Sequence, residues 1–155
     1  MHTLYDTLAT LHIDVDEVEH EAVTTVEAAQ FVKMLIDGVG VKNLLLCNTR
    51  GDYYLVMLDE DKRADLKELA RIVHSGRLSF ANADQLHAVL GLEPGSVTPL
   101  AVINDANHAV TVLIDRALVG NRLLVHPLTN TRTMAIDYDD LIRFLDATGH
   151  TPIPF

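Results

Sequence analysis

Two apolar segments on either side of a short turn constrain the fold of this chain. Residues 43–48 and 53–58 are dominated by leucine, valine, methionine and tyrosine, and the Thr49-Arg50-Gly51-Asp52 sequence between them is typical of a hairpin turn. Strands joined by so short a turn must pair antiparallel, because a parallel pair needs a crossover of roughly a dozen residues or more. The pair therefore excludes a sheet built only from repeated β-α-β units.

Later segments are expected to extend this sheet. Residues 100–103, 110–114, 123–125 and 133–136 are apolar and of a composition that favours strands. Asp105-Ala106-Asn107 is expected to form a hairpin loop between the first two of them.

Helical patterns precede, separate and follow these strands, which predicts an α+β fold with a mixed, largely antiparallel sheet. Five segments carry apolar residues at helical spacing or helix-capping residues. They are residues 4–11 after Thr3, residues 26–36 with a Thr24/Glu27 capping box, residues 62–73, the segment between Asn82 and Gly91, and the segment between Asp137 and Gly149.

The length and composition fit a single domain over residues 1–155. A chain of this length buries roughly 70% of its unfolded surface, and a hydrophobic content of 48% excludes disorder as the main state. The apolar runs are too short to span a membrane, and the first eleven residues show no signal-peptide pattern. Cys47 is the single cysteine, so no intrachain disulfide forms and we expect a cytoplasmic protein.

The net charge of −10 argues against nucleic-acid binding through bulk electrostatics. The charges are unevenly distributed, however. Residues 1–30 hold seven acidic side chains and no Lys or Arg, whereas residues 62–77 hold five of the twelve basic ones. This basic window is either a solvated helix face or a contact for an anionic partner, and it comprises Lys62, Arg63, Lys67, Arg71 and Arg77.

One loop has the composition of an anion-binding backbone. The segment Gly91–Pro99 contains two glycines and two prolines, which fix an unusual backbone path. Such a loop can direct the backbone N–H groups around Gly95 and Ser96 at an anion or a developing oxyanion. A plain connection between a helix and a strand is the alternative.

Two strand ends carry polar residues that could bind or react. Lys42 could hold a phosphate, and Asn43 could form a hydrogen bond with a substrate. His126, which Pro127 holds in an extended conformation, could donate a hydrogen bond or move a proton. Asn130 could contact a ligand or fix the turn.

Several common catalytic motifs are absent from the sequence. No two of the eight histidines have the HExxH or HxxxH spacing, which argues against a zinc site. There is no GxSxG, Walker A or GxGxxG motif, and Ser96 has no visible base partner for a role as nucleophile.

Four segments, taken in order, carry a resemblance to a known family. They are Lys42-Asn43-Leu44-Leu45-Leu46, Leu78-Ser79-Phe80-Ala81, Gly91-Leu92-x-Pro94-Gly95-Ser96-Val97-Thr98-Pro99 and His126-Pro127-Leu128-x-Asn130-x-x-Thr133. The chain resembles the YbaK and prolyl-tRNA-synthetase-associated editing domain family, and most closely its freestanding bacterial deacylases of Ala-tRNA(Pro). Residues 19–27 also fit the opening segment of that family, except that Glu21 replaces the usual proline.

The resemblance implies a curved mixed sheet surrounded by helices, with a pocket at the mouth of the sheet. It implies metal-free hydrolysis of the ester between an amino acid and the terminal ribose of a tRNA, without a cofactor. The adjacent ribose hydroxyl would assist the reaction. The implied partners are the acceptor end of tRNA(Pro) and prolyl-tRNA synthetase, with no membrane.

The matching motifs also assign residues to roles. The expected catalytic residues are Lys42, Asn43, Gly95, Ser96 and His126, and the expected substrate contacts are Thr98, Pro99 and Asn130. Lys42 would hold the terminal phosphate, and the basic window would contact the acceptor stem. The candidates for the pocket wall are Phe31, Met34, Leu35 and Leu100.

Three other functions stay open on the sequence alone. The first is deacylation of Cys-tRNA(Pro) or of another small mischarged amino acid, because one sequence does not fix the volume of the pocket. The second is a noncatalytic module that binds tRNA or a synthetase without turnover. The third is a metal-dependent hydrolase.

Overall fold

A computed structural model of the protein describes residues 3–22 and 25–155, with the side chain of Val26 excepted. The helices are α1 (Leu4–Thr10), α2 (Val26–Leu35), α3 (Leu66–Ile72), α4 (Ala83–Leu90) and α5 (Tyr138–Ala147), with short 3₁₀ helices η1 (Pro99–Asn104) and η2 (Arg116–Leu118). The strands are β1 (Asp16–Glu19), β2 (Val39–Cys47), β3 (Tyr53–Asp59), β4 (Ser79–Phe80), β5 (Val110–Ile114), β6 (Arg122–Val125), β7 (Arg132–Asp137) and β8 (Ile153–Pro154).

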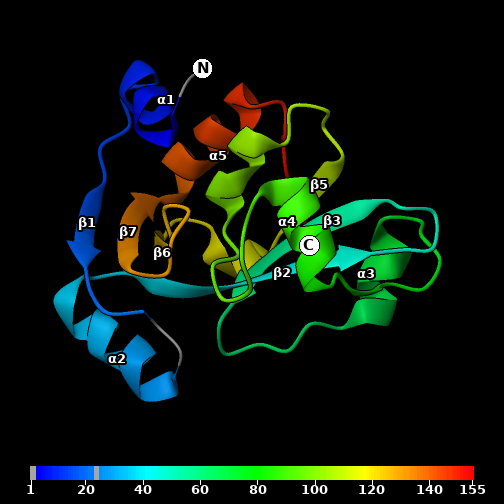
Figure 1. Cartoon of the computed structure of the whole chain (residues 1–155), viewed down its shortest axis with the longest axis horizontal. Coiled ribbons are helices and arrows are strands. Elements are labelled where there is room, and N and C mark those ends of the chain that lie inside the picture. The colour runs from blue at the N-terminus through cyan, green and yellow to red at the C-terminus, as the bar shows by residue number, and fades with distance from the viewer. Residues whose placement is uncertain (1–2, 23–24) are drawn as a thin grey trace.

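The strands form one mixed sheet in the order β1-β7-β6-β2-β3-β5-β8, with β4 paired to β2 (Figure 1). Within the described residues, four of the seven strand pairings are antiparallel and three are parallel. The predicted α+β class and the mixed, largely antiparallel sheet are therefore confirmed. No helix among the described residues is long and apolar enough to cross a membrane.

Helices cover both faces of the sheet. The largest core joins α1, α4, α5 and η1 to one face, around fully buried side chains such as Phe144 and Met134. On the opposite face, α3 packs on β2, β3 and β5. There α2 packs on β6 through Val32, Ile36 and Leu124. The two helices on this second face thus lie over different halves of the sheet.

Strand β2 belongs to both halves of the sheet, and the halves separate along its length. Its start pairs in parallel with β6, where Gly40 lies opposite Leu124. Its end pairs with β4, where Leu46 lies opposite Phe80. Between these contacts, no described strand pairs with that edge of β2, while β3 pairs with the other edge throughout. We call this gap between β2 and β6 the fork.

Most predicted elements are confirmed, and their capping residues explain their positions. A capping box of Thr3 and Asp6 opens α1, and one of Asn82 and Gln85 opens α4. The left-handed Gly91, with φ of 69°, ends α4 as expected of a helix C-terminus. The hairpin between β2 and β3 has the predicted turn.

Several boundaries differ from the prediction. Thr25 caps α2, since its hydroxyl accepts a hydrogen bond from the Ala28 N–H at 3.0 Å, and the predicted cap Thr24 lies outside the described residues. Helix α3 begins only after its N-cap Asp65. Strand β2 begins at Val39 rather than at residue 43. The sequence analysis did not predict β1, β4 and β8, which are four residues long or shorter.

The expected strand over residues 100–103 was wrong, because this segment forms the 3₁₀ helix η1. The Thr98 hydroxyl accepts a hydrogen bond from the Leu100 N–H at 3.3 Å, and Pro99 opens the helix with its fixed backbone angle. Leu100 and Ala101 are fully buried, so the segment has the continuous apolar run of a buried strand.

The loop after η1 is therefore not a hairpin but a buried polar anchor. Asp105 accepts hydrogen bonds from the N–H groups of Ala109 and Val110 and from His150 Nε2, the last at 2.9 Å. Burial alone would raise the pKa of Asp105, but the bonds from His150 and the two N–H groups outweigh it and hold the pKa below its ordinary value. This anchor joins the segment after α5 to the start of β5.

We predict that Asp105→Asn lowers the free energy of unfolding at pH 7 by about 3 kcal/mol, because it disrupts the hydrogen bonds that a buried carboxylate accepts from two backbone N–H groups and His150. The folded-state pKa of Asp105 lies below its ordinary value of 3.8, so its contribution is complete above that pH and is lost as the pH falls through the folded pKa. The gap between wild type and variant in urea denaturation should therefore shrink from pH 6 to pH 3. Asp146→Asn, at an exposed position on α5, is the control. A gap that stays constant would contradict this assignment.

Candidate functional site

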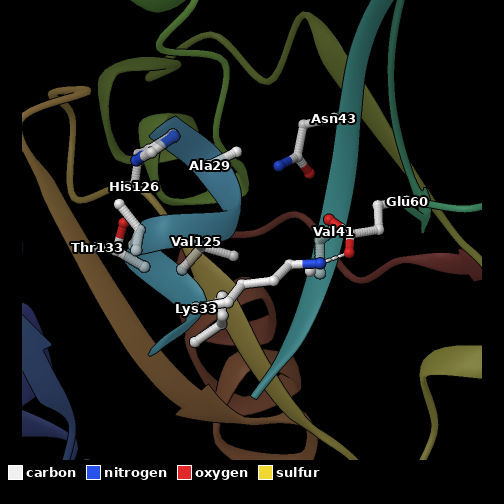
Figure 2. A pocket seen from close by; sticks show the side chains of 11 residues that line it. Ala29, Lys33, Val41, Asn43, Glu60, Val125, His126 and Thr133 are labelled. Carbon is white, nitrogen blue, oxygen red and sulfur yellow. Dashed lines mark ion pairs between the residues drawn. The ribbon is translucent and has the colours of Figure 1, made fainter. Parts of the chain in front are cut away.

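A pocket of about 150 Å³ opens at the fork, between β2, β6 and helix α2 (Figure 2). Its apolar wall consists of Ala29, Val32, Val41, Leu124 and Val125. Its polar groups are Lys33, Asn43, Glu60, His126 and Thr133. The pocket exists because β2 and β6 separate after Gly40, so none of the described strands fills the space that α2 covers.

Asn43 extends from β2 into this pocket (Figure 2). Its Oδ1 atom is buried and has no hydrogen-bond partner among the described residues. Leaving a buried acceptor unpaired costs about 1–3 kcal/mol, so native proteins rarely keep one without a reason. Because Asn43 lines the pocket, a ligand bound there that donates a hydrogen bond would satisfy this atom.

His126 stands at the end of β6 on the other side of the pocket from Asn43 (Figure 2). Its Nδ1 lies 2.9 Å from the carbonyl oxygen of Arg132, which can only accept, so Nδ1 donates. In the neutral ring, Nε2 then carries a lone pair. His126 is therefore held as a hydrogen-bond acceptor or base through Nε2.

Thr133 and His20 complete this side of the pocket. Thr133 lies on β7, is 5% exposed and lines the pocket. His20 Nε2 lies 2.8 Å from Thr133 Oγ1, and the His20 and His126 rings are 6.5 Å apart between centroids. Both residues lie in segments that resemble the family, but neither was expected to have a role. Their contact joins positions 113 residues apart in the chain, which no local pattern reveals.

Lys33 and Glu60 form an ion pair across the mouth of the pocket (Figure 2). Lys33 comes from α2, and Glu60 follows β3. Gly40 makes room for the carboxylate, since a Cβ atom there would collide with Glu60. None of the three residues was expected at the site, because no local pattern in the sequence shows that they meet.

Lys42 lies outside this pocket. Neighbouring residues of a strand point to opposite faces, so Lys42 lies on the other face of β2 from Asn43. The Lys42 ammonium donates a hydrogen bond to the carbonyl oxygen of Lys62 at 2.5 Å. Lys42 instead lines a shallow hollow with Arg63 and the exposed Phe80.

The Gly91–Pro99 loop does not provide the expected oxyanion site through Ser96. The Ser96 N–H already donates to the Glu93 carbonyl oxygen at 3.1 Å, and Ser96 is buried. Thr98 and Pro99 are buried and form the start of η1, so neither is accessible to a substrate. Their residue types serve the 3₁₀ helix, which accounts for the Thr-Pro sequence.

The remaining loop residues lie beside one another but not in the pocket wall. Gly95 has φ of 90°, and a Cβ atom placed on it would lie 3.8 Å from Asn130 Nδ2. The Gly91–Pro99 loop therefore approaches the loop that follows His126. Neither Gly95 nor Asn130 is among the residues that line the pocket.

The expected wall residues of the pocket were also wrong. Phe31, Met34 and Leu35 project from the exposed face of α2, with 59%, 82% and 47% of their surface accessible. Leu100 is fully buried in the main core. The pocket-facing side of α2 carries Ala29, Val32 and Lys33 instead.

Within the described residues, two of the five side chains of the basic window form ion pairs with carboxylates. The Lys62 ammonium pairs with the buried Asp115 at 3.0 Å, and Arg71 pairs with Glu68. Lys67 and Arg77 line a hollow beside α3 together with Arg71. Within residues 3–22 and 25–155, no group of three or more His, Cys, Asp or Glu side chains is arranged to hold a metal ion.

Comparison with known proteins agrees with the fold and the motifs. The family model of the aminoacyl-tRNA editing domain matches residues 19–144. The chain is 39% identical over 145 residues to the prolyl-tRNA editing protein ProX of Acetoanaerobium sticklandii, covering 91% of this chain and 87% of that protein. It is 36% identical over 153 residues to the prolyl-tRNA synthetase associated domain-containing protein 1 of Danio rerio, covering 97% and 83%.

A solved structure gives the same result for the fold. The crystal structure of a candidate trans-editing enzyme for prolyl-tRNA synthetase superposes with a TM-score of 0.71 at 24% identity, covering 96% of this chain and 90% of that one. The resemblance found in the sequence is thus confirmed. Because the family model spans most of its length, the chain belongs to the aminoacyl-tRNA editing domain family.

Proposed function

We propose that this protein hydrolyses mischarged Ala-tRNA(Pro) as a trans-editing deacylase, with residues 1–155 acting as a single domain. Membership of the editing family makes it an aminoacyl-tRNA deacylase. The observation that carries the proposal is the small pocket at the fork, where Asn43 Oδ1 has no partner among the described residues and His126 Nε2 offers a lone pair in the neutral ring. Both relatives are named for prolyl-tRNA editing or prolyl-tRNA synthetase, which supports tRNA(Pro) as the substrate.

The size of the pocket supports a small aminoacyl group. A volume of about 150 Å³ is similar to that of an engineered cavity that binds benzene, so the pocket has room for a small aminoacyl group. A synthetase pocket shaped for proline cannot strongly reject alanine, because missing methylene groups are worth only about 1–3 kcal/mol. A second, smaller pocket can exclude proline by its size, which is the logic of a double sieve.

The proposed reaction needs no protein nucleophile. Water attacks the ester carbonyl carbon, the bond from that carbon to the ribose oxygen breaks, and this oxygen leaves with a proton. The products are the free amino acid and a tRNA with an intact 3′ end. His126 Nε2 accepts a hydrogen bond from the neighbouring ribose hydroxyl and orients it toward the attacking water.

The open edge of β2 offers a donor for the developing oxyanion. The Leu45 carbonyl accepts from the Ala81 N–H on the β4 side, and the Gly40 carbonyl accepts from the Glu60 N–H on the β3 side. Backbone groups alternate along a strand, so the Asn43 N–H points toward the fork, where no described strand pairs with it. This N–H replaces Ser96 as the proposed oxyanion donor.

A basic face beside the pocket fits the acceptor end of the tRNA. Lys42 on β2 and Arg63 in the loop after β3 line one hollow, with Phe80 61% exposed beside them. Lys67 and Arg77 extend this face along α3. Cations bind phosphates, and an exposed aromatic ring stacks on a base of a single-stranded end.

The first test is turnover of labelled Ala-tRNA(Pro), Cys-tRNA(Pro) and Pro-tRNA(Pro) in the presence of a chelator. We expect rapid loss of alanine only, and we expect His126→Ala to lower kcat by about 100-fold, because misplacing a reacting group can cost a factor of this size. His74→Ala, an exposed histidine in the loop after α3, is the control. Loss of cysteine alone would show that Cys-tRNA(Pro) is the substrate instead. Binding of tRNA without turnover would indicate a noncatalytic module. Full activity of His126→Ala would contradict the site.

The volume of the pocket can be tested from α2. Ala29→Leu should lower kcat/KM for Ala-tRNA(Pro) by about 10-fold or more, because the added side chain fills space that the alanyl group needs. Gln30→Leu adds the same side chain at an exposed position outside the pocket and should have no effect. Equal activity of the two variants would show that the substrate does not use this pocket.

The basic face can be tested by charge reversal. Lys67→Glu and Arg77→Glu should each weaken tRNA(Pro) binding and reduce the slope of log K against log salt by about 1. Arg116→Glu reverses an exposed charge on η2 and serves as the control. An equal change of slope in all three variants would show that Lys67 and Arg77 belong to a solvated surface that makes no specific contact with the tRNA.

A further inference from the structure

The hydroxyl of Thr133 faces the pocket as a hydrogen-bond acceptor when it donates its own hydrogen bond to the neutral ring of His20. His20 Nδ1 lies 2.7 Å from the Glu21 carbonyl oxygen, which only accepts, so Nδ1 carries the proton of the neutral ring. Nε2 then holds a lone pair 2.8 Å from Thr133 Oγ1. A hydroxyl has one proton, so after donating it to His20 the Thr133 oxygen offers only lone pairs to the pocket.

The pocket holds two further acceptors beside the Thr133 oxygen. Asn43 Oδ1 is buried without a partner in the described part of the chain, and His126 Nε2 offers a lone pair. At the mouth, the Glu60 carboxylate is already paired with the Lys33 ammonium. A pocket lined in this way favours a ligand that brings several N–H donors.

Building on the proposed deacylase function, we infer that Thr133 Oγ1 and Asn43 Oδ1 bind the α-ammonium group of the aminoacyl ester, with His20 as a positioning residue. The ammonium carries three protons, enough for both oxygens. Hydrogen bonds from a charged donor are stronger than neutral ones. This group distinguishes an aminoacyl ester from every other ester, so the two oxygens select the substrate class.

The contact between His20 and Thr133 is not needed to hold the strands together. Backbone pairing already joins β1 to β7, with Val18 opposite Thr133. The backbone N–H of His20 also donates a hydrogen bond to the Thr131 carbonyl oxygen at 2.9 Å. The side-chain bond therefore adds little to the attachment of β1, and its main consequence is the orientation of the Thr133 hydroxyl.

The test compares Ala-tRNA(Pro) with lactyl-tRNA(Pro), in which a hydroxyl replaces the ammonium. Thr133→Val should lower kcat/KM for the alanyl ester by about 10- to 100-fold, the value of a hydrogen bond to a charged group. The lactyl ester should lose less than about 3-fold. Comparing each variant with wild type on the same ester cancels the difference in intrinsic reactivity. Thr133→Ser keeps the hydroxyl and should restore the preference for the alanyl ester.

Substitutions of His20 test the positioning role without touching the pocket wall. His20→Phe removes the acceptor, so the Thr133 proton is free to point into the pocket and the alanyl-to-lactyl preference should fall about 10-fold. His20→Gln supplies a carbonyl oxygen to accept that proton and should retain most of the preference. A purely structural role predicts equal losses on both esters.

Binding of nonhydrolysable analogues separates this inference from the proposed function. The analogues carry an alanyl or a lactyl amide on 3′-amino-3′-deoxyadenosine, and calorimetry measures their affinities for the full chain. Equal affinity of wild type for the two, or equal losses on both esters in Thr133→Val, would overturn the inference. If wild type turns over no aminoacyl-tRNA, the deacylase proposal fails instead, and a Thr133-dependent preference for the alanyl amide would still support the ammonium site.

Discussion

The incomplete pairing of strand β2 is the constraint on which the candidate site depends. A sheet normally satisfies the backbone groups on both edges of a central strand. Within the described residues, the edge of β2 toward β6 is paired with a strand only near its two ends. The cost of the open stretch is reduced by the hairpin with β3, which holds the other edge along its length. The separation of the two half-sheets leaves room for a pocket in a part of the sheet that would otherwise be solid core.

Hydrogen-bond counting assigns one tautomer to the neutral form of each of the two histidines of the site. Each of them places Nδ1 against a backbone carbonyl oxygen, so each neutral ring presents the lone pair of Nε2. His126 directs that lone pair to the pocket itself. His20 directs it to Thr133, whose hydroxyl hydrogen then points to His20 while its oxygen lone pairs face the pocket. The backbone thus sets the polarity of the pocket through two side chains of the same type.

Local signals in the sequence predicted most of the fold. Caps such as Thr3 and Asn82 mark helix starts through bonds within four residues, and the turn between residues 49 and 52 defines a hairpin without distant information. Residues 100–103 misled the prediction because a continuous apolar run describes a buried 3₁₀ helix as well as a buried strand. Only burial and the cap at Thr98 separate the two.

The site was less predictable, because its members meet only through the topology. Asn43 and His126 were found as polar residues beside apolar strands, and the structure brings both to one pocket. Lys42 was grouped with Asn43 by adjacency in the sequence, although the alternation of a strand sends the two to opposite faces. Thr133 and Lys33 reach the pocket from β7 and α2, and no pattern along the chain relates them.

The same alternation explains how a protein with a net charge of −10 can offer a site to a tRNA end. It places Asn43 on the side of β2 that faces the uncharged wall of the pocket, and Lys42 on the side that faces Arg63 and α3. Binding of the aminoacyl group and attraction of the phosphates are thereby assigned to two sides of one strand. Because only the end of the tRNA approaches this strand, few phosphate contacts are needed, and the acidic residues elsewhere need not oppose them.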